Sequence, residues 1–212
     1  MSAQVKFRQE PGLAEGLRSR KKVQTRRSIE DAALALFAEH GYDATTVEQI
    51  SDQAEVSTAT FFRYFPSKAD VVLCQQGEQI PLLQQTIIER PAGEGDIDVV
   101  RIAFHEVWVP AIDPERTMRA GQAINSSPLL RGLYGDISRN WLTAVAEALA
   151  RRRGLNDSDP RSKVAARVAL AVFGGAVENW MTGGCVESLS EVIDRDFATV
   201  ETLYAGPVGA GA

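Results

Sequence analysis

The spacing of the apolar residues constrains this chain more than any other feature. Apolar side chains recur every three or four residues in segment after segment, whereas strict alternation of apolar and polar residues is hard to find. A recurrence of three and four fits the 3.6-residue turn of an α-helix, and alternation would fit a strand. The sequence therefore predicts an all-α protein, and 212 residues are enough to bury a sizeable core.

The first third of the chain divides into one longer helix and two short ones. The longer helix carries one apolar face over residues 29–37 and meets a typical stop at Gly41. Two short segments follow, VEQISDQA and TATFFRYF, and Pro66 ends the second. The residues that can cap their first turns are Thr45 or Thr46 for the first segment and Ser57 or Thr58 for the second.

Two short helices joined by a tight turn and supported by a longer helix form a helix-turn-helix, a unit that reads DNA. Ala54 is small where the two short helices would cross, and Phe61 and Phe65 can anchor the second one from below. The opposite surface of the second helix then carries Thr58, Ala59, Phe62 and Arg63. From this pattern alone, any other three-helix mini-bundle remains a competing interpretation.

The remaining two thirds of the chain also have helical spacing. A segment that begins at Lys68 is kinked or ended by Pro81, and the looser stretch RPAGEGD follows it. The expected helices beyond this stretch cover residues 97–109, 114–125, 128–153, 161–182 and 188–204. The last residues, GPVGAGA, are expected to be disordered.

Charge is distributed unevenly along the chain. The net charge of −5 lies wholly after residue 66, because the first 66 residues hold nine basic and nine acidic side chains. Within that balanced part, residues 18–27 hold six basic side chains and no acidic one. Such a cluster can contact phosphates even on an acidic protein, because nearby charges dominate within a Debye length. A solvated N-terminal tail is the alternative interpretation.

Several classes of protein are disfavoured. No apolar run approaches the roughly 20 residues that a membrane span needs, no secretory signal is visible, and the two cysteines are far apart. These features favour a cytoplasmic protein. The pair His105–Glu106 lacks the second histidine of a zinc-protease motif, and no phosphate-binding loop or nucleophile elbow is present. We therefore expect no enzyme activity, no cofactor and no metal site.

The stretch RRSIEDAALALFAEHGYDATTVEQISDQAEVSTATFFRYFPSKADVV, residues 26–72, resembles the N-terminal domain of the TetR family of repressors. The rest of the chain is similar in layout to the diverged regulatory domain of that family. The basic GLRSRKKVQTRR lead and the FFRYFPSKADVV wording resemble an actinobacterial subgroup that includes the mycofactocin-system regulator. The resemblance implies an N-terminal three-helix DNA-binding domain followed by a C-terminal helical domain that binds a ligand and dimerises.

The resemblance also implies roles for particular residues. Those at the start of the second helix contact phosphate and nearby bases, those of the recognition helix read bases, and two more contact phosphate. The corresponding residues here are Thr46 and Val47; Thr58, Ala59 and Arg63; and Tyr64 and Lys68. Phe62 stands where the family usually has a tyrosine, so a phosphate-binding hydroxyl is missing there.

The segment VAARVALAVFGGAV, residues 164–177, is apolar almost all round and must be buried on several sides. A central helix of a monomer is one solution. The resemblance favours another, a four-helix dimer bundle formed with the last helix. Two recognition helices about 34–36 Å apart would then read a palindrome.

Aromatic and polar residues of the C-terminal part are candidates for a ligand pocket, although core packing explains each of them singly. They are Phe104, Trp108, Met118, Arg119, Asn125, Trp141, Phe173 and Trp180. The resemblance implies a small effector that releases DNA, and for the subgroup an acyl-CoA-like or other long apolar molecule.

The predicted organisation has four parts. They are a flexible basic extension (1–20), the helix-turn-helix domain (21–66), the ligand-binding and dimerisation domain (67–205) and a disordered tail (206–212). The predicted function is a ligand-responsive repressor that binds double-stranded DNA as a homodimer and is released by a small apolar effector. The alternative is a helical ligand-binding or scaffold protein whose three-helix head contacts protein. The sequence does not reveal the operator, the regulated genes, the effector or the number of dimers per operator.

Overall fold

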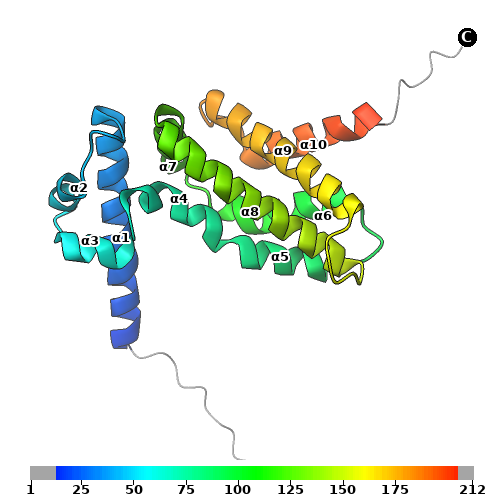
Figure 1. Ribbon diagram of the computed structural model, residues 1–212, viewed down its shortest axis with the longest axis horizontal. Coiled ribbons are helices and arrows are strands. Elements are labelled where there is room, and N and C mark those ends of the chain that lie inside the picture. Colours follow the sequence, from blue (N-terminus) through cyan, green and yellow to red (C-terminus); the bar gives the residue numbers. More distant parts are fainter. Residues whose placement is uncertain (1–12, 205–212) are drawn as a thin grey trace, which may run out of the picture. The chain divides into compact units, whose positions relative to one another are not determined.

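The computed structural model describes residues 13–204, and all of its regular elements are helices (Figure 1). The predicted all-α class is confirmed. None of the helices in the described part of the chain is both long and apolar enough to cross a bilayer. The helices are α1 (Leu13–His40), α2 (Val47–Gln53), α3 (Thr58–Tyr64), α4 (Lys68–Glu78), α5 (Ile80–Glu89), α6 (Asp96–Ala103), α7 (Pro114–Ser126), α8 (Pro128–Arg152), α9 (Pro160–Thr182) and α10 (Leu189–Tyr204).

The chain forms two compact units, and the division falls between Val71 and Val72, inside α4. The sequence placed the boundary five residues earlier, at Pro66, where the proline ends a helix. In the structure, Lys68 in the first turn of α4 donates hydrogen bonds to the carbonyls of Tyr42 and Thr45. The first turn of α4 therefore belongs to the N-terminal unit.

The core of the N-terminal unit forms where α1 packs against α2 and α3. One face of α1 carries Ile29, Ala33 and Phe37, which are all buried. Phe61 and Phe65 lie four residues apart on the inner side of α3, and both side chains are fully buried. Burial of an aromatic side chain of this size contributes about 1.5–3 kcal/mol. The predicted anchoring of α3 by these two phenylalanines is confirmed.

The beginning of α1 differs from the sequence-based expectation. Residues 13–20 were expected to form a flexible extension, but they are the first turns of a helix that continues to His40. The physical reason lies in the composition of LAEGLRSRKKVQTRR, which is rich in strong helix formers and has no proline after Pro11. Residues 1–12 and the expected tail at 206–212 lie outside the described residues.

In the C-terminal unit, α9 packs against both α8 and α10, α5 packs against α8, and α6 packs against α9 (Figure 1). The four helices expected over residues 114–125, 128–153, 161–182 and 188–204 are confirmed to within one residue at each end. Pro81 does not kink one long helix. It lies in the first turn of α5, a position in which the missing N–H of proline costs nothing.

The single helix expected over residues 97–109 is interrupted. After α6 the chain forms a π-helical turn, Phe104–Trp108, and a short 3₁₀ turn, Val109–Ala111. The amide of Val109 donates to the carbonyl of Phe104, five residues back. Pro110 explains the change, because its ring would clash with the carbonyl four residues earlier in a regular α-helix. The apolar periodicity of residues 97–109 did not indicate that the hydrogen bond here reaches back five residues and not four.

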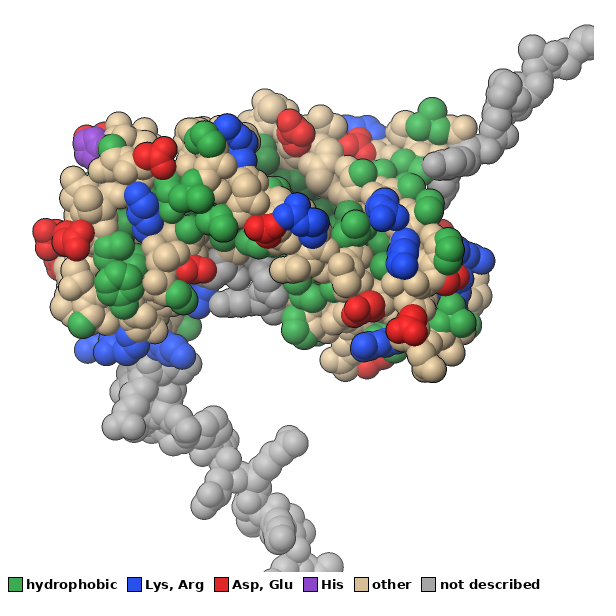
Figure 2. Space-filling view, viewed as in Figure 1, with side chains coloured by type: hydrophobic (Ala, Val, Ile, Leu, Met, Phe, Trp, Pro, Cys, Tyr) green, Lys and Arg blue, Asp and Glu red, His purple; other side chains and the backbone are tan. Residues whose placement is uncertain are grey.

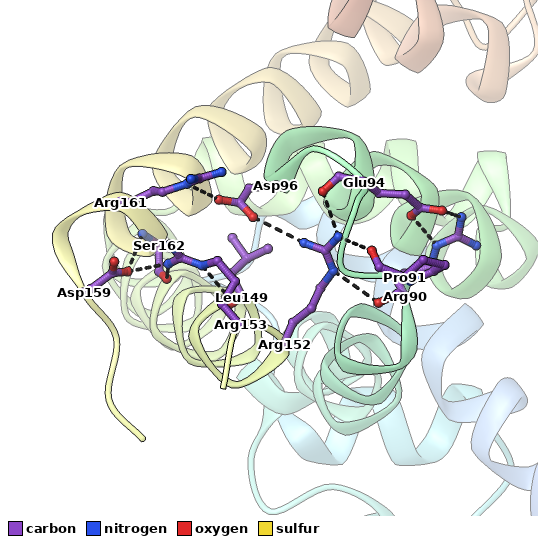
Figure 3. A network of polar contacts seen from close by, with 10 residues as sticks. All are labelled: Arg90, Pro91, Glu94, Asp96, Leu149, Arg152, Arg153, Asp159, Arg161 and Ser162. Carbon is purple, nitrogen blue, oxygen red and sulfur yellow. Dashed lines mark hydrogen bonds and ion pairs between the residues drawn. The ribbon is translucent and has the colours of Figure 1, made fainter. Parts of the chain in front are cut away.

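A buried arginine ties three parts of the C-terminal unit together (Figure 3). The side chain of Arg152, at the end of α8, is 1% exposed, and its Nη1 donates to Asp96 at the start of α6 over 3.3 Å. Its Nη2 donates to the carbonyls of Glu94, at 2.7 Å, and Pro91, and its Nε donates to the carbonyl of Arg90 at 3.3 Å. The glycine-containing loop between α5 and α6 is thus held by one guanidinium.

A second arginine joins the same network from α9. The Nε of Arg161 lies 2.7 Å from the other carboxylate oxygen of Asp96, and the side chain of Arg161 is largely exposed. Nearby, hydrogen bonds from Ser162 and then from Arg153 hold the pKa of the Asp159 carboxyl well below its usual range. Asp159 caps the N-terminus of α9, so these bonds join the ends of α8 and α9.

Candidate nucleic-acid interface and aromatic cluster

Side-chain caps fix the starts of both short helices. Thr46 and Gln49 form a reciprocal capping box at α2, in which the amide of Gln49 donates to Thr46 Oγ1 over 3.2 Å and the amide of Thr46 donates to Gln49 Oε1 over 2.8 Å. Ser57 caps α3 by accepting from the amide of Thr60 at 3.1 Å. The structure thereby selects Thr46 and Ser57 from the alternatives that the sequence left open. The reach of Gln49 back to Thr46 was missed, although the T-x-x-Q spacing indicates it.

The turn between α2 and α3 is a Schellman motif. The amide of Val56 donates to the carbonyl of Ser51 over 2.9 Å, and the amide of Glu55 donates to the carbonyl of Asp52 over 3.1 Å. Glu55 has φ of 54°, in the left-handed region where glycine is usual. The sequence predicted a turn between the two short helices, and the structure shows that a glutamate takes its left-handed position. Tight closure of the motif sets the direction in which α3 leaves α2.

The outer side of α3 is open to solvent. Thr58 and Ala59 in its first turn are exposed, and so are Phe62, with 54% of its surface accessible, and Arg63. Short side chains in the first turn allow the helix end to come close to base edges. Arg63 lies with its guanidinium 5.4 Å from the centroid of the Tyr64 ring, and Tyr64 is half-buried. The structure therefore brings these predicted residues onto one helix, and all but Tyr64 are exposed.

The start of α2 lies at the surface of the same unit. Thr46 is exposed, and its hydroxyl oxygen accepts from Gln49, so its proton is available for an acceptor such as a phosphate oxygen. Val47 is half-buried, so only part of this residue is accessible to a ligand such as DNA. The predicted contacts of these two residues with phosphate and bases stay predictions.

Lys68 has partners that the sequence did not indicate. Its ammonium donates to the carbonyls of Tyr42 and Thr45, at 2.7 and 2.8 Å, and approaches that of Asp43 at 3.5 Å. It also lies 4.3 Å from the centroid of the Tyr42 ring. An ammonium has three donors. This arrangement favours a structural role, in which Lys68 closes the α1–α2 loop, over the phosphate contact that the resemblance implies.

Lys68→Met is expected to lower the free energy of unfolding of the N-terminal unit by about 1.5–3 kcal/mol, because charged hydrogen bonds to the loop are lost. The slope of DNA affinity against salt should stay unchanged. Thermal unfolding followed by circular dichroism, and binding titrations over a salt series, measure the two effects. A flatter salt slope at unchanged stability would instead establish Lys68 as a phosphate ligand.

The C-terminal unit brings four of the predicted pocket residues into one aromatic cluster, which consists of Phe104, Trp108, Trp141 and Phe173. The Phe104 and Phe173 rings stack with their centroids 3.8 Å apart. The Trp108 ring meets Phe173 edge-on at 5.3 Å and Trp141 at 6.0 Å. Phe104 and Trp108 are the first and last residues of the π-helical turn, which places both on the same side toward α9 and α8. All four contribute to the main hydrophobic core.

Trp108 has a feature of its own. Its indole N–H is buried and donates to no acceptor among the residues that the structure describes. A buried donor without a partner costs about 1–3 kcal/mol, and such groups are rare in native proteins. This N–H is therefore an unsatisfied polar group within the otherwise apolar cluster.

The other predicted pocket residues lie elsewhere. Trp180 is buried, but its indole N–H donates to the carbonyl of Glu187 at 2.9 Å, so it closes the α9–α10 connection. On α7, Arg119 pairs with Glu115, Asn125 is exposed, and Met118 is half-buried. Neither of the two polar residues belongs to the aromatic cluster, and their role in ligand binding stays a prediction.

Comparison with known proteins yields two matching family models. Residues 29–73 match bacterial regulatory proteins of the tetR family, and residues 96–205 match the MftR C-terminal domain. The HTH-type transcriptional regulator TcmR of Streptomyces glaucescens is 32% identical over 173 residues, which cover 78% of this chain and 76% of TcmR. The HTH-type transcriptional repressor AcnR of Corynebacterium efficiens is 27% identical, over 88% of this chain and 96% of AcnR.

Solved structures show the same fold. FadR of Thermus thermophilus, a transcriptional repressor in complex with lauroyl-CoA, superposes with a TM-score of 0.54 at 22% identity, over 88% of this chain and 97% of FadR. The complex of SmeT with triclosan gives a TM-score of 0.55 at 23% identity, over 82% of this chain and 90% of SmeT. At this level of identity, the likeness concerns the arrangement of the helices.

Proposed function

Since the chain belongs to the TetR family of bacterial regulatory proteins, we propose that it is a transcriptional repressor that binds a palindromic operator as a homodimer and is released by a small apolar effector. The exposed outer side of α3 carries this proposal. Thr58, Ala59 and Arg63 point away from a core formed by two fully buried phenylalanines, and the helix is capped by Ser57. A short helix that is fixed from behind and open in front suits the major groove.

Arg63→Ala is expected to weaken operator binding by about 1–3 kcal/mol and to relax the preference at one base pair, because a guanidinium can bond two acceptors of guanine at once. Gel-shift titrations with a set of single-base operator variants measure both effects. Arg63→Lys is the matched control, because it keeps the charge but cannot form the bidentate pair. Unchanged affinity together with unchanged base preference would remove Arg63 from this role.

The exposed side of α9 supports the proposed homodimer. Val164 is 58% exposed, and the small residues Ala171 and Gly174 lie on the same side. A side chain added at Gly174 would meet nothing within 4 Å, so packing inside one protomer does not require glycine there. A helix of a second protomer that approaches α9 closely would require a residue as small as glycine at this position. A sedimentation mass near twice 23.1 kDa at micromolar concentration is expected, and a monomer under these conditions contradicts the dimer.

The aromatic cluster supports the proposed effector class. The rings of Phe173 and Trp141 lie against Trp108 in an apolar environment, and the buried indole N–H of Trp108 is a donor that an oxygen of a ligand would satisfy. Lauroyl-CoA in FadR and triclosan in SmeT combine apolar bulk with polar atoms, and we propose an acyl-CoA-like or similarly apolar molecule here. Such a molecule acts only if it binds one arrangement of the DNA-binding heads better than another. The α4–α5 segment (residues 68–89), which runs from the N-terminal into the C-terminal unit, is the proposed lever.

Selection of bound fragments from random duplex DNA tests the proposed function. Recovery of an inverted repeat, with half-sites about one helical turn apart, is the expected result. Binding should also fall steeply as salt rises, with a slope near 0.9 per neutralised phosphate. If no sequence is enriched and binding does not respond to salt, the three-helix head contacts something other than DNA.

A further inference from the structure

The basic residues of the α1 lead, defined here as residues 20–27, lie at fixed positions because the lead is helical. Arg20, Lys21, Lys22 and Arg27 are exposed, and no acidic residue occurs between Glu15 and Glu30. Figure 2 shows Lys and Arg side chains gathered around this end of α1. On a flexible tail, these charged side chains would have no fixed direction. On a helix, each charge points to one side.

Both lysines of the α1 lead lie on the side of α1 that faces the helix-turn-helix. Lys22 precedes Arg26 by four residues, and the Arg26 guanidinium lies 5.1 Å from the centroid of the Phe65 ring at the end of α3. Lys21 precedes Ser28 by seven residues, and the Ser28 hydroxyl donates to the carbonyl of Ala54 between α2 and α3. Residues four or seven apart share a helix face.

This face is packed against α2 and α3 further along the helix and is uncovered at the lead. At 1.5 Å per residue, Lys22 lies about 6 Å along α1 beyond the contact of Arg26 with Phe65, the C-cap residue of α3. Arg20 and Arg27 lie seven residues apart on another side of the helix, and Gln24 between them is exposed too. Only the side with Lys21 and Lys22 continues the surface on which α3 lies.

We propose that Lys21 and Lys22 bind the phosphate backbone of duplex DNA on the flank of the half-site that α3 reads. The inference rests on the proposed DNA binding and adds a second contact element, which the helix-turn-helix does not include. A duplex in contact with the outer side of α3 extends past both ends of this seven-residue helix. The phosphate backbone of this duplex then lies within reach of lysine side chains that are placed one turn of α1 beyond the contact of Arg26 with Phe65. This contact does not depend on the base sequence of the DNA, and it lengthens the stretch of DNA that each protomer covers.

The double variant Lys21→Gln, Lys22→Gln tests the proposal in the full-length protein. The slope of log affinity against log salt should become shallower by about 0.9 for each lost phosphate contact, hence by up to about 3.6 for a dimer that loses four. Hydroxyl-radical protection should shrink at the outer edges of the operator. The preferred base at each position should not change, because phosphate contacts carry no sequence information.

The double variant Arg20→Gln, Arg27→Gln is the matched control, since it removes the same charge from the same segment of α1 on another side of the helix. It should leave the outer footprint intact and change the slope by less than the lysine pair does. The conservative pair Lys21→Arg, Lys22→Arg should retain the wild-type slope. An unchanged slope in the lysine variant, or an equal loss in both double variants, overturns the proposal. Wild-type protein that fails to bind duplex DNA in a salt-dependent way overturns the proposed function itself.

Discussion

Phe61→Ala is expected to abolish operator binding by unfolding the N-terminal unit. Phe61 is fully buried, and its ring meets Phe65 at 5.9 Å and Phe62 at 5.4 Å. Truncation of a buried phenylalanine costs about 3–5 kcal/mol, which is most of the stability that a unit of this size can have. Calorimetry should show that the transition of the N-terminal unit moves to lower temperature or disappears, while the C-terminal unit still unfolds cooperatively.

Phe62→Ala is the matched control, because the same side chain is removed from the adjacent position. Phe62 is 54% exposed, so the change in stability should stay within about 0.5 kcal/mol. If the outer side of α3 contacts DNA, this variant weakens binding with an unchanged melting profile. Two variants with equal losses of stability would mean that α3 is not packed in the way described here.

Arg152→Met is expected to destabilise the C-terminal unit by about 3–5 kcal/mol. The substitution keeps most of the side-chain length and removes the guanidinium, so Asp96 and three loop carbonyls lose a donor in a buried place. Asp96 then keeps only the largely exposed Arg161 as an ion-pair partner, and the loop carbonyls lose their buried donor. Urea unfolding of the full-length protein, followed by tryptophan fluorescence, measures the effect, because Trp108, Trp141 and Trp180 all lie in this unit.

Arg161→Gln acts on the same carboxylate from the other side and serves as the comparison. The Arg161 side chain is 68% exposed, against 1% for Arg152, so the loss of its ion pair should cost less than about 1 kcal/mol. Similar costs for both variants would show that burial does not decide the strength of this network. A cost below 1 kcal/mol for Arg152→Met would contradict the role given to its guanidinium.

Short-range patterns allowed much of the fold to be predicted. Helix caps act over three residues, and the apolar repeat acts over three or four. The bounds of α7, α8, α9 and α10 can therefore be predicted from residues that are close together in the sequence. The same holds for the spacing of α2 and α3 and for the buried pair Phe61 and Phe65. These features depend on little beyond the local chain.

The features that could not be predicted depend on distant partners. The ammonium of Lys68 meets carbonyls 23 to 26 residues away, and Arg152 meets a loop about 60 residues away. Lysine and arginine are usually exposed, so composition gave no reason to expect a half-buried Lys68 or a buried Arg152. Residues 13–20 were misjudged for another reason. A run of basic residues suggests a tail, while the same residues are good helix formers, and helix formation prevailed.

The π-helical turn at Phe104–Trp108 holds one residue more than a regular helix needs over the same rise. Each residue of an α-helix advances the direction of the side chains by about 100°, so a shortening of this turn by one residue would swing everything after it through that angle. Trp108 would then leave Phe173 and Trp141, and its indole N–H would face a new neighbourhood. In related sequences, a gap of a single position here would therefore indicate a differently arranged aromatic cluster more clearly than any substitution in the rings themselves.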